Sequence, residues 1–254
     1  MHTTSTTTNP LLHFLTGATF ISFSGIWVAW AGLDPTVSAF YRVFLGTIFL
    51  LAGCLWKKEF HRLDPRTIFL LVLSSLAFAA DLVCWHASIS YIGPGLSTII
   101  GNFQVFILTL ISITFFGQRP TAGFLISLPL AIIGLSLIIG FDWSTLSETY
   151  VLGIFLALLT ALFYSIFILS MRHAQVIQPH VSSVYNLMIV SALTSLFLIP
   201  AVLFAEVTFA IPTLRSFGAL IGLALFSQTI GWILIATNLP RVIPSIAGLL
   251  LLLQ

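Results

Sequence analysis

The sequence predicts an all-α integral membrane protein made of two inverted five-helix repeats, of which the second is truncated. Three observations lead to this fold class: the composition, the division of the chain into apolar runs, and a similarity between its two halves. Of the 254 residues, 59% are hydrophobic and only 6% are charged, whereas soluble domains carry roughly 25% charged residues. Such a chain is expected to fold in a lipid bilayer.

Apolar runs divide the chain into lengths that suit a bilayer, because a helix needs roughly 20 residues to cross about 30 Å of hydrocarbon. Short segments rich in charges, Pro and Gly separate these runs, and none is long enough for a soluble domain. The runs cover residues 11–31, 37–56, 67–90, 95–116, 121–141, 151–171, 181–205 and 214–238, and a ninth begins near Val242. About nine of ten transmembrane helices are therefore expected.

The basic residues predict the orientation, because Lys and Arg are retained in cytoplasmic loops. With the polar tail 1–10 in the cytoplasm, only Arg215 of the loop residues lies outside. The cytoplasmic loops then hold Lys57, Lys58, Arg62, Arg66, Arg119, Arg172 and Arg241. We expect a multi-pass protein of the plasma membrane, or of the inner membrane in a bacterium.

A self-similarity relates the two halves of the chain. The segment 34–42 matches the segment 178–186, with Pro, Val, Ser and Tyr at the same positions and one offset of 144 throughout. Five helices separate equivalent positions, and an odd number makes the second copy enter the membrane from the opposite side. This is the inverted repeat of secondary transporters. The copies are assigned to residues 11–141 and 151–254.

The repeat also predicts that the full plan has ten helices. The chain stops at Gln254, too soon after Pro244 for another complete span. We therefore expect either a C-terminal truncation or a natural gene that lacks the last one and a half helices, and the residues leave both open.

Asp81 is the first candidate for a functional site, because an ionisable group in hydrocarbon is costly and is usually kept for function. It lies near the middle of the third span, and Trp85 and Ser88 follow at i+4 and i+7 on the same helical face. This face could bind a substrate cation or carry a proton. Equally, Asp81 could be a structural group paired with Arg42, whose place near a helix end favours anchoring.

Further candidates lie on the neighbouring spans. The fourth span carries two polar stripes. One holds Ser97, Gly101 and Gln104, and the other holds Thr98, Asn102 and Thr109. One stripe is expected to line a cavity while the other packs. Gln228 and Trp232 take the place in the eighth span that Asp81 and Trp85 take in the third. His86 points about 140° from Asp81 and is a weaker candidate, since it could simply join two helices. The aromatic walls are expected from Tyr164 and Trp27, although membrane aromatics more often pack.

Other function classes have little support in the sequence. An enzyme is not expected: Asp81 is the only deep carboxylate, no His, Cys and carboxylate cluster has metal-ligand spacing, and no glycine loop could cradle phosphate. No metal or cofactor is predicted. The net charge is only +2 and the basic residues lie in a few short loops, so neither the size nor the pattern of a nucleic-acid binding surface is present.

Several short motifs resemble those of the EamA-type transporters of the drug/metabolite transporter superfamily. They are Phe40-Tyr-Arg42, Tyr91-Ile-Gly-Pro-Gly-Leu-Ser97 and Phe115-Phe-Gly-Gln-Arg119, in which Gln118 replaces the usual Glu. The resemblance covers the chain from Leu11 onward. It implies a ten-helix bundle that exports or exchanges small metabolites through a central cavity lined by both repeats, often with coupling to protons.

The predicted function is therefore secondary transport of a small organic metabolite or drug-like molecule by alternating access. Its expected partners are that substrate and the lipid bilayer, with protons as a candidate coupling ion and a homodimer as a candidate assembly. The alternative from another class is a membrane protein that transports nothing, such as a sensor or an assembly subunit.

Overall fold

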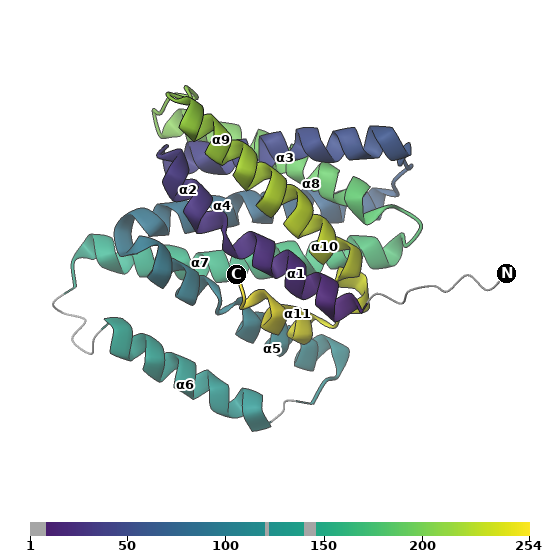
Figure 1. Cartoon of the computed structure of the whole chain (residues 1–254). Helices are drawn as coiled ribbons and strands as arrows, with labels where there is room; N and C mark the ends of the chain where they lie inside the picture. Colours follow the sequence, from purple (N-terminus) through teal and green to yellow (C-terminus); the bar gives the residue numbers. More distant parts are fainter. Residues whose placement is uncertain (1–8, 120–121, 140–145) are drawn as a thin grey trace.

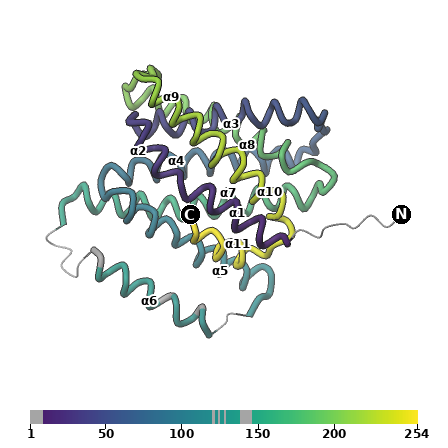
Figure 2. Tube along the Cα trace, viewed as in Figure 1, coloured from purple at the N-terminus to yellow at the C-terminus, as the bar shows by residue number. Residues whose placement is uncertain are grey.

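The computed structural model describes residues 9–119, 122–139 and 146–254, and within these ranges all regular structure is helical. The helices run along a shared direction and form one bundle (Figure 1). Connections gather at its two ends. The N-terminal residues of the first helix lie at the right-hand end in Figure 2, which we call the N-side, and the opposite end is the far side.

The first span consists of two helices, α1 (Pro10–Ser22) and α2 (Ser24–Ala31), with a turn at Phe23 between them. The second span is α3 (Pro35–Lys57). A proline at the first position of α1 and of α3 fixes a backbone angle that suits a helix start. The Asp34 carboxylate accepts a hydrogen bond from the amide of Thr36 at 2.8 Å, which satisfies one free donor at the start of α3.

The next helix, α4 (Pro65–Gly101), is really two spans joined at a sharp turn. Gly93 has φ 79° and ψ 162°, a conformation that side chains disfavour, and Pro94 follows it. The chain reverses there and returns through the end of α4 and through α5 (Gln104–Phe116), as Figure 1 shows. The sequence boundary at Gly93-Pro94-Gly95 is thus the turn between the third and fourth spans.

The remaining spans follow in the predicted order. Helix α6 (Ala122–Ile139) lies at the edge of the bundle, α7 (Glu148–Ile177) crosses its centre, and α8 (Ser183–Phe204) returns. One long rod then contains α9 (Leu214–Gly222), the π-helix η2 (Leu223–Gly231), α10 (Trp232–Asn238) and the short 3-10 turn η3 (Leu239–Arg241). The last helix, α11 (Pro244–Leu251), packs against α5 and α1.

Among the residues that the structure describes, six helical segments are long and apolar enough to cross a membrane. One of them, the 52-residue segment Pro65–Phe116, crosses twice because it reverses at Gly93. Many large apolar side chains point outward, including Trp56 at 88% exposure and Phe115 at 78%. This pattern suits a surface covered by lipid, and it confirms the predicted all-α membrane fold.

The centre of the bundle is formed by α4 and α7, which lie side by side, and by α3 against α8. Their shared core contains Phe78, Phe167, Met171 and Leu187, all almost fully buried. The rod from α9 to α10 crosses α1 and also packs on α3. The arrangement leaves a space on the far side of this core, between α1, α3, α4 and α7.

Candidate functional site

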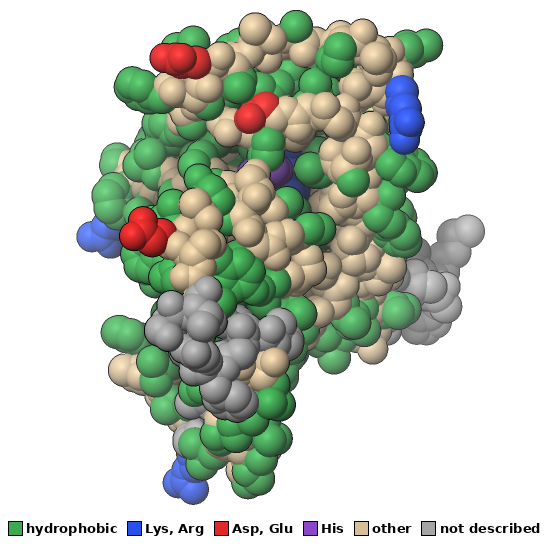
Figure 3. Space-filling model, turned by 90° about the vertical axis from the view of Figure 1, so that its left-hand side faces the viewer, with side chains coloured by type: hydrophobic (Ala, Val, Ile, Leu, Met, Phe, Trp, Pro, Cys, Tyr) green, Lys and Arg blue, Asp and Glu red, His purple; other side chains and the backbone are tan. Residues whose placement is uncertain are grey.

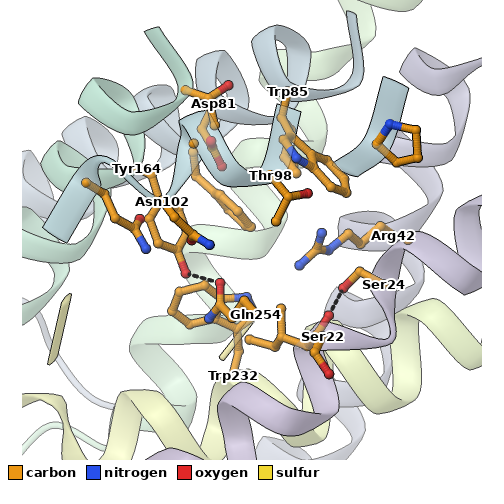
Figure 4. Close-up of a pocket in the computed structure, with 18 residues that line it drawn as sticks. Ser22, Ser24, Arg42, Asp81, Trp85, Thr98, Asn102, Tyr164, Trp232 and Gln254 are labelled. Atoms are coloured by element: carbon orange, nitrogen blue, oxygen red, sulfur yellow. Dashed lines mark hydrogen bonds between the residues drawn. The ribbon is translucent and has the colours of Figure 1, made fainter. Parts of the chain in front are cut away.

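A cavity of about 140 Å³ lies near the middle of the bundle, next to the turns that interrupt its helices. Its wall combines aromatic side chains with a ring of polar ones from both halves of the chain (Figure 4). The aromatic residues are Phe78, Trp85, Tyr164 and Trp232, and the other polar residues are Ser22, Ser24, Arg42, Asp81, Thr98, Asn102, Gln104, Thr160 and Gln254. An apolar cavity with a few convergent polar groups is typical of small-molecule sites.

Arg42 supplies the positive charge of the cavity. It lies on α3 with only 5% of its surface exposed, and its guanidinium reaches into the cavity in Figure 4. Its Nε donates a hydrogen bond of 3.1 Å to Oε1 of Gln228, and the Gln228 amide nitrogen donates one of 3.0 Å to the hydroxyl of Ser191. One edge of the guanidinium is therefore held while the rest faces the cavity.

Asp81 supplies the negative charge. It lies on α4, is 5% exposed, and approaches the cavity from the wall opposite Arg42 (Figure 4). The two groups are close enough to influence each other electrostatically, yet within the described ranges neither has an ion pair of 4 Å or less. Two opposite charges in one buried cavity, without direct pairing, can contact a third group placed between them.

The floor of the cavity is a cluster of aromatic rings. The Phe78 and Phe167 rings stack with centroids 4.4 Å apart, and the Trp232 ring stands edge-on to Phe167 at 4.8 Å. Tyr164 joins the cluster with its ring 6.0 Å from that of Trp232. These rings belong to the same packed core as Met171 and Ala174, which follow on α7 toward its N-side end.

A break between α4 and α5 explains which polar stripe of the fourth span faces the cavity. The helix is interrupted at Asn102 and Phe103, so the stripes do not continue on fixed faces. Members of both stripes line the cavity as a result: Thr98 and Asn102 from one, Gly101 and Gln104 from the other. The expectation that only one stripe would line the cavity is valid for an unbroken helix, and this helix is broken.

A similar break in the first span brings two serines to the cavity. The Ser22 hydroxyl donates to the carbonyl of Thr19 at 2.7 Å, and the Ser24 hydroxyl donates to the carbonyl of Ile21. Serine hydroxyls that bond to carbonyls of the preceding turn bend membrane helices. Sequence analysis did not single out these serines, although two serines on either side of Phe23 are the available signal.

Five of the eight predicted site residues line the cavity: Asp81, Trp85, Asn102, Gln104 and Tyr164. The other three lie nearby without lining it. Gln228 stands behind Arg42. His86 is fully buried, with Nδ1 2.7 Å from the carbonyl oxygen of Leu82. Trp27 packs against the backbone at Gly222 and stacks on Phe226 at 6.0 Å.

Arg42 is the main residue whose place differs from expectation. The sequence favoured an anchor that reaches toward the membrane surface, because Arg42 is near the end of its span. The structure instead buries it in the cavity, where Gln228 binds its Nε. The position of Arg42 along α3 gives its depth in the membrane. The direction of its side chain depends on how α3 packs against η2, and the local sequence does not reveal that packing.

The cavity opens toward the far side. Pro94, Thr98 and Ser24 of its lining lie close in sequence to the far-side turns at Gly93 and Gly32. Figure 3 views the left-hand end of Figure 1, which is this far side. It shows a hollow bordered by apolar side chains and by backbone and other side chains, with a histidine and a basic side chain at its base. On the N-side, by contrast, the aromatic floor and the connecting loops cover the bundle.

The fold and the cavity define a multi-pass helical membrane protein with a polar cavity at its centre. Residues 9–140, just over half of the chain, match the model of the EamA-like transporter family. The chain therefore belongs to the EamA-like transporter family, within the drug/metabolite transporter superfamily. Its members are transporters rather than enzymes, so a small-molecule substrate and a lipid bilayer are its partners at this level.

Comparison with solved structures shows the same fold in other proteins. One of them, described only as "Crystal structure of protein", aligns with a TM-score of 0.75 over 96% of this chain and 84% of its own length, at 16% sequence identity. In all, 21 chains of solved structures match. No curated protein matches the sequence. Within the described ranges no group of three or more His, Cys, Asp or Glu side chains could hold a metal ion.

Proposed function

We propose that this protein is a secondary transporter of a small zwitterionic metabolite, which it moves by alternating access. The observation that carries the proposal is the pair of unjoined charges, Arg42 and Asp81, on opposite walls of the cavity. The Arg42 guanidinium binds a carboxylate of the solute, and Asp81 binds its ammonium group. No other side chain of the cavity lining is formally charged, so a neutral zwitterion matches the charge balance of these side chains.

The aromatic wall supports the same assignment. Trp85, Tyr164 and Trp232 surround the space between the two charges (Figure 4), and rings of this kind contact the apolar part of a solute while the charges orient its polar end. A solute with only one charge would leave the other charge of the cavity desolvated without a partner, which is costly.

Alternating access is supported by the asymmetry of the two ends. The cavity opens toward the far side, while the N-side is covered by loops and by the aromatic floor. A second state, open on the N-side and closed on the far side, would complete a transport cycle.

The orientation that we propose places the N-side in the cytoplasm. The loop residues Lys58 and Arg62 follow α3 at its N-side end, and Arg241 lies at the N-side end of the rod. Arg215 lies at the far-side start of α9. Positive residues are retained in the cytoplasm, so this distribution supports a cytoplasmic N-terminus and a cavity open to the outside in this state.

We also propose that the bundle is an inverted repeat with copies at 11–141 and 151–254. The sequence offset of 144 relates α3 to α8. Helix α3 packs on α8 and on η2, and α8 packs on α3 and on α4. If α4 corresponds to the rod that contains η2, these two sets of contacts are equivalent, as a twofold relation between the copies requires. Arg42 then corresponds to Asn186.

Exchange of solute in proteoliposomes tests the transport function. We expect exchange of at least one labelled amino acid from a panel of the twenty standard ones. Arg42→Gln and Asp81→Asn should each reduce it by about tenfold or more, since a charged hydrogen bond contributes roughly 1.5–3 kcal/mol. Arg215→Gln and Glu148→Gln, which neutralise exposed charges outside the cavity, are the matched controls. Exchange that survives both cavity substitutions would disprove the charge-pair assignment.

A further inference from the structure

Gln228 contacts Arg42 from outside the cavity and has no exposed surface. Its Oε1 accepts the hydrogen bond from Arg42 Nε at 3.1 Å, and its Nε2 donates to the Ser191 hydroxyl at 3.0 Å. The three side chains belong to η2, α3 and α8, so this chain of hydrogen bonds connects three helices behind the cavity wall. Sequence analysis had counted Gln228 among the candidates for substrate binding or coupling.

Two local features allow Gln228 to come this close to α3. A Cβ at Gly46 would lie 2.5 Å from Cγ of Gln228 and 3.1 Å from its Cβ, so only glycine leaves room for the side chain. Gln228 also lies within the π-helix η2, where the Thr229 hydroxyl bonds to the carbonyl five residues earlier, at Ala224. π-Helical turns are rare and are found frequently at functional sites.

The hydrogen bond to Ser191 sets the direction of the Gln228 amide. Because Nε2 donates to Ser191, the oxygen is left to face the guanidinium. A reversed amide would direct its N–H groups at the donors of Arg42. An amide is also neutral, so it holds Arg42 without cancelling its positive charge. A carboxylate at position 228 would cancel that charge.

We infer that Gln228 is a positioning residue that aims Arg42 at the substrate carboxylate, an inference that rests on the proposed function. A guanidinium has five N–H donors in a planar fork. With Nε occupied by Gln228, the two terminal nitrogens remain for a carboxylate. The same contact keeps Arg42 from swinging across the cavity to pair with Asp81, the opposite charge that faces it, which would remove both charges from substrate recognition.

Binding selectivity tests this inference. The probe is the amino acid that the wild-type protein binds best, compared with the carboxamide of the same amino acid, and both affinities are measured by titration calorimetry on the full chain in detergent. The wild type should prefer the carboxylate over the carboxamide by about tenfold to a hundredfold. Gln228→Met keeps the length of the side chain and removes both hydrogen bonds, and should lower this preference to about threefold or less.

Three further variants separate positioning from a general effect on folding. Ser191→Ala removes only the acceptor of the Gln228 amide and should lower the carboxylate preference in the same direction. Gln228→Glu keeps an acceptor for Arg42 but cancels its charge, so it should also lose the preference. Thr237→Val is the matched control on α10 of the same rod: it removes a hydroxyl whose hydrogen bond goes to the carbonyl of Ile233 at 2.7 Å and should keep the wild-type preference.

Arg42→Gln distinguishes failure of this inference from failure of the proposed function. If Arg42→Gln retains the carboxylate preference, Arg42 does not bind the carboxylate and the proposed function is wrong. If Arg42→Gln loses the preference while Gln228→Met and Ser191→Ala both keep it, Arg42 needs no positioning by Gln228 and the inference is overturned. Loss of preference in all three, with Thr237→Val unchanged, supports it.

Discussion

Asn186 is a buried polar residue whose side chain forms no hydrogen bond in the described part of this conformation. It lies on α8 with 0% exposure, and neither its amide oxygen nor its amide nitrogen has a hydrogen-bond partner in the described part of the chain. A buried amide without partners costs about 1–3 kcal/mol. Because it corresponds to Arg42 in the proposed repeat, its polarity is explained if it gains partners when the N-side opens.

Replacing Asn186 by Leu, which has the same branching, should therefore stabilise the conformation seen here. We expect Asn186→Leu to raise the free energy of unfolding by about 1 kcal/mol, measured by thermal or denaturant unfolding in detergent. Asn238→Leu is the control with the opposite expectation, because the Asn238 amide donates to the carbonyl of Leu234 at 2.8 Å and that hydrogen bond would be lost. A fall in stability for Asn186→Leu would show that Asn186 has a partner after all.

The roles of the site residues stay predictions, but their positions show which arguments located them. Asp81 lines the cavity, and the sequence singled it out because a carboxylate in hydrocarbon is costly wherever its helix packs. Arg42, whose charge should have carried equal weight, was assigned to anchoring because its distance to a helix end was known and its neighbour Gln228 was not. His86 and Trp27 have the chemistry of site residues, but their helices turn them toward Leu82 and Gly222.

Helix interruptions are the features of individual elements that the sequence did not reveal. The turn at Gly93 was expected from Gly and Pro, and it is present. The breaks at Phe23 and at Asn102 and Phe103, and the π-helix η2, have no such marker. These interruptions depend on serine back-bonding and on contacts with other helices, so they follow from packing rather than from local propensity.

The crossing of α1 over η2 depends on two glycines. A Cβ at Gly17 would lie 2.7 Å from the carbonyl oxygen of Gly231 and 2.9 Å from Cγ1 of Ile235, and backbone cannot move aside as a flexible side chain can. Small residues of this kind allow close contact between membrane helices. The contact fixes the first span against the rod that contains Gln228.

Gly17→Ala should therefore destabilise the protein by about 1–3 kcal/mol, because the added methyl group overpacks the crossing. The loss should appear as a lower unfolding midpoint in detergent. Gly53→Ala on α3 is the matched control: nothing lies within 4 Å of its added Cβ, and alanine favours a helix by roughly 1 kcal/mol over glycine. Equal midpoints for the two variants would mean that α1 does not cross η2 this closely.

At the scale of the whole molecule, hydrogen bonds tie together the N-side connections of the two proposed copies. The Ser182 hydroxyl donates to the Glu59 carboxylate, the Asp64 amide donates to the side-chain oxygen of Gln178 at 3.0 Å, and the Ser245 hydroxyl donates to that of Gln118 at 2.8 Å. A solute in the cavity cannot pass to this side while these contacts and the aromatic floor hold. Alternating access thus requires their release.

A reversible crosslink across the N-side tests that requirement. Glu59→Cys and Ser182→Cys, combined with Cys54→Ala and Cys84→Ala to remove the native thiols, place one cysteine on each side of this contact. A short bifunctional methanethiosulfonate reagent should join them and abolish solute exchange in proteoliposomes, and a reductant should restore it. Binding should remain, because the cavity opens on the other face. The single Glu59→Cys variant in the same background should be insensitive to the reagent. Exchange that continues in fully crosslinked protein would mean that the solute passes without opening the N-side. It would disprove the requirement that these contacts be released during transport.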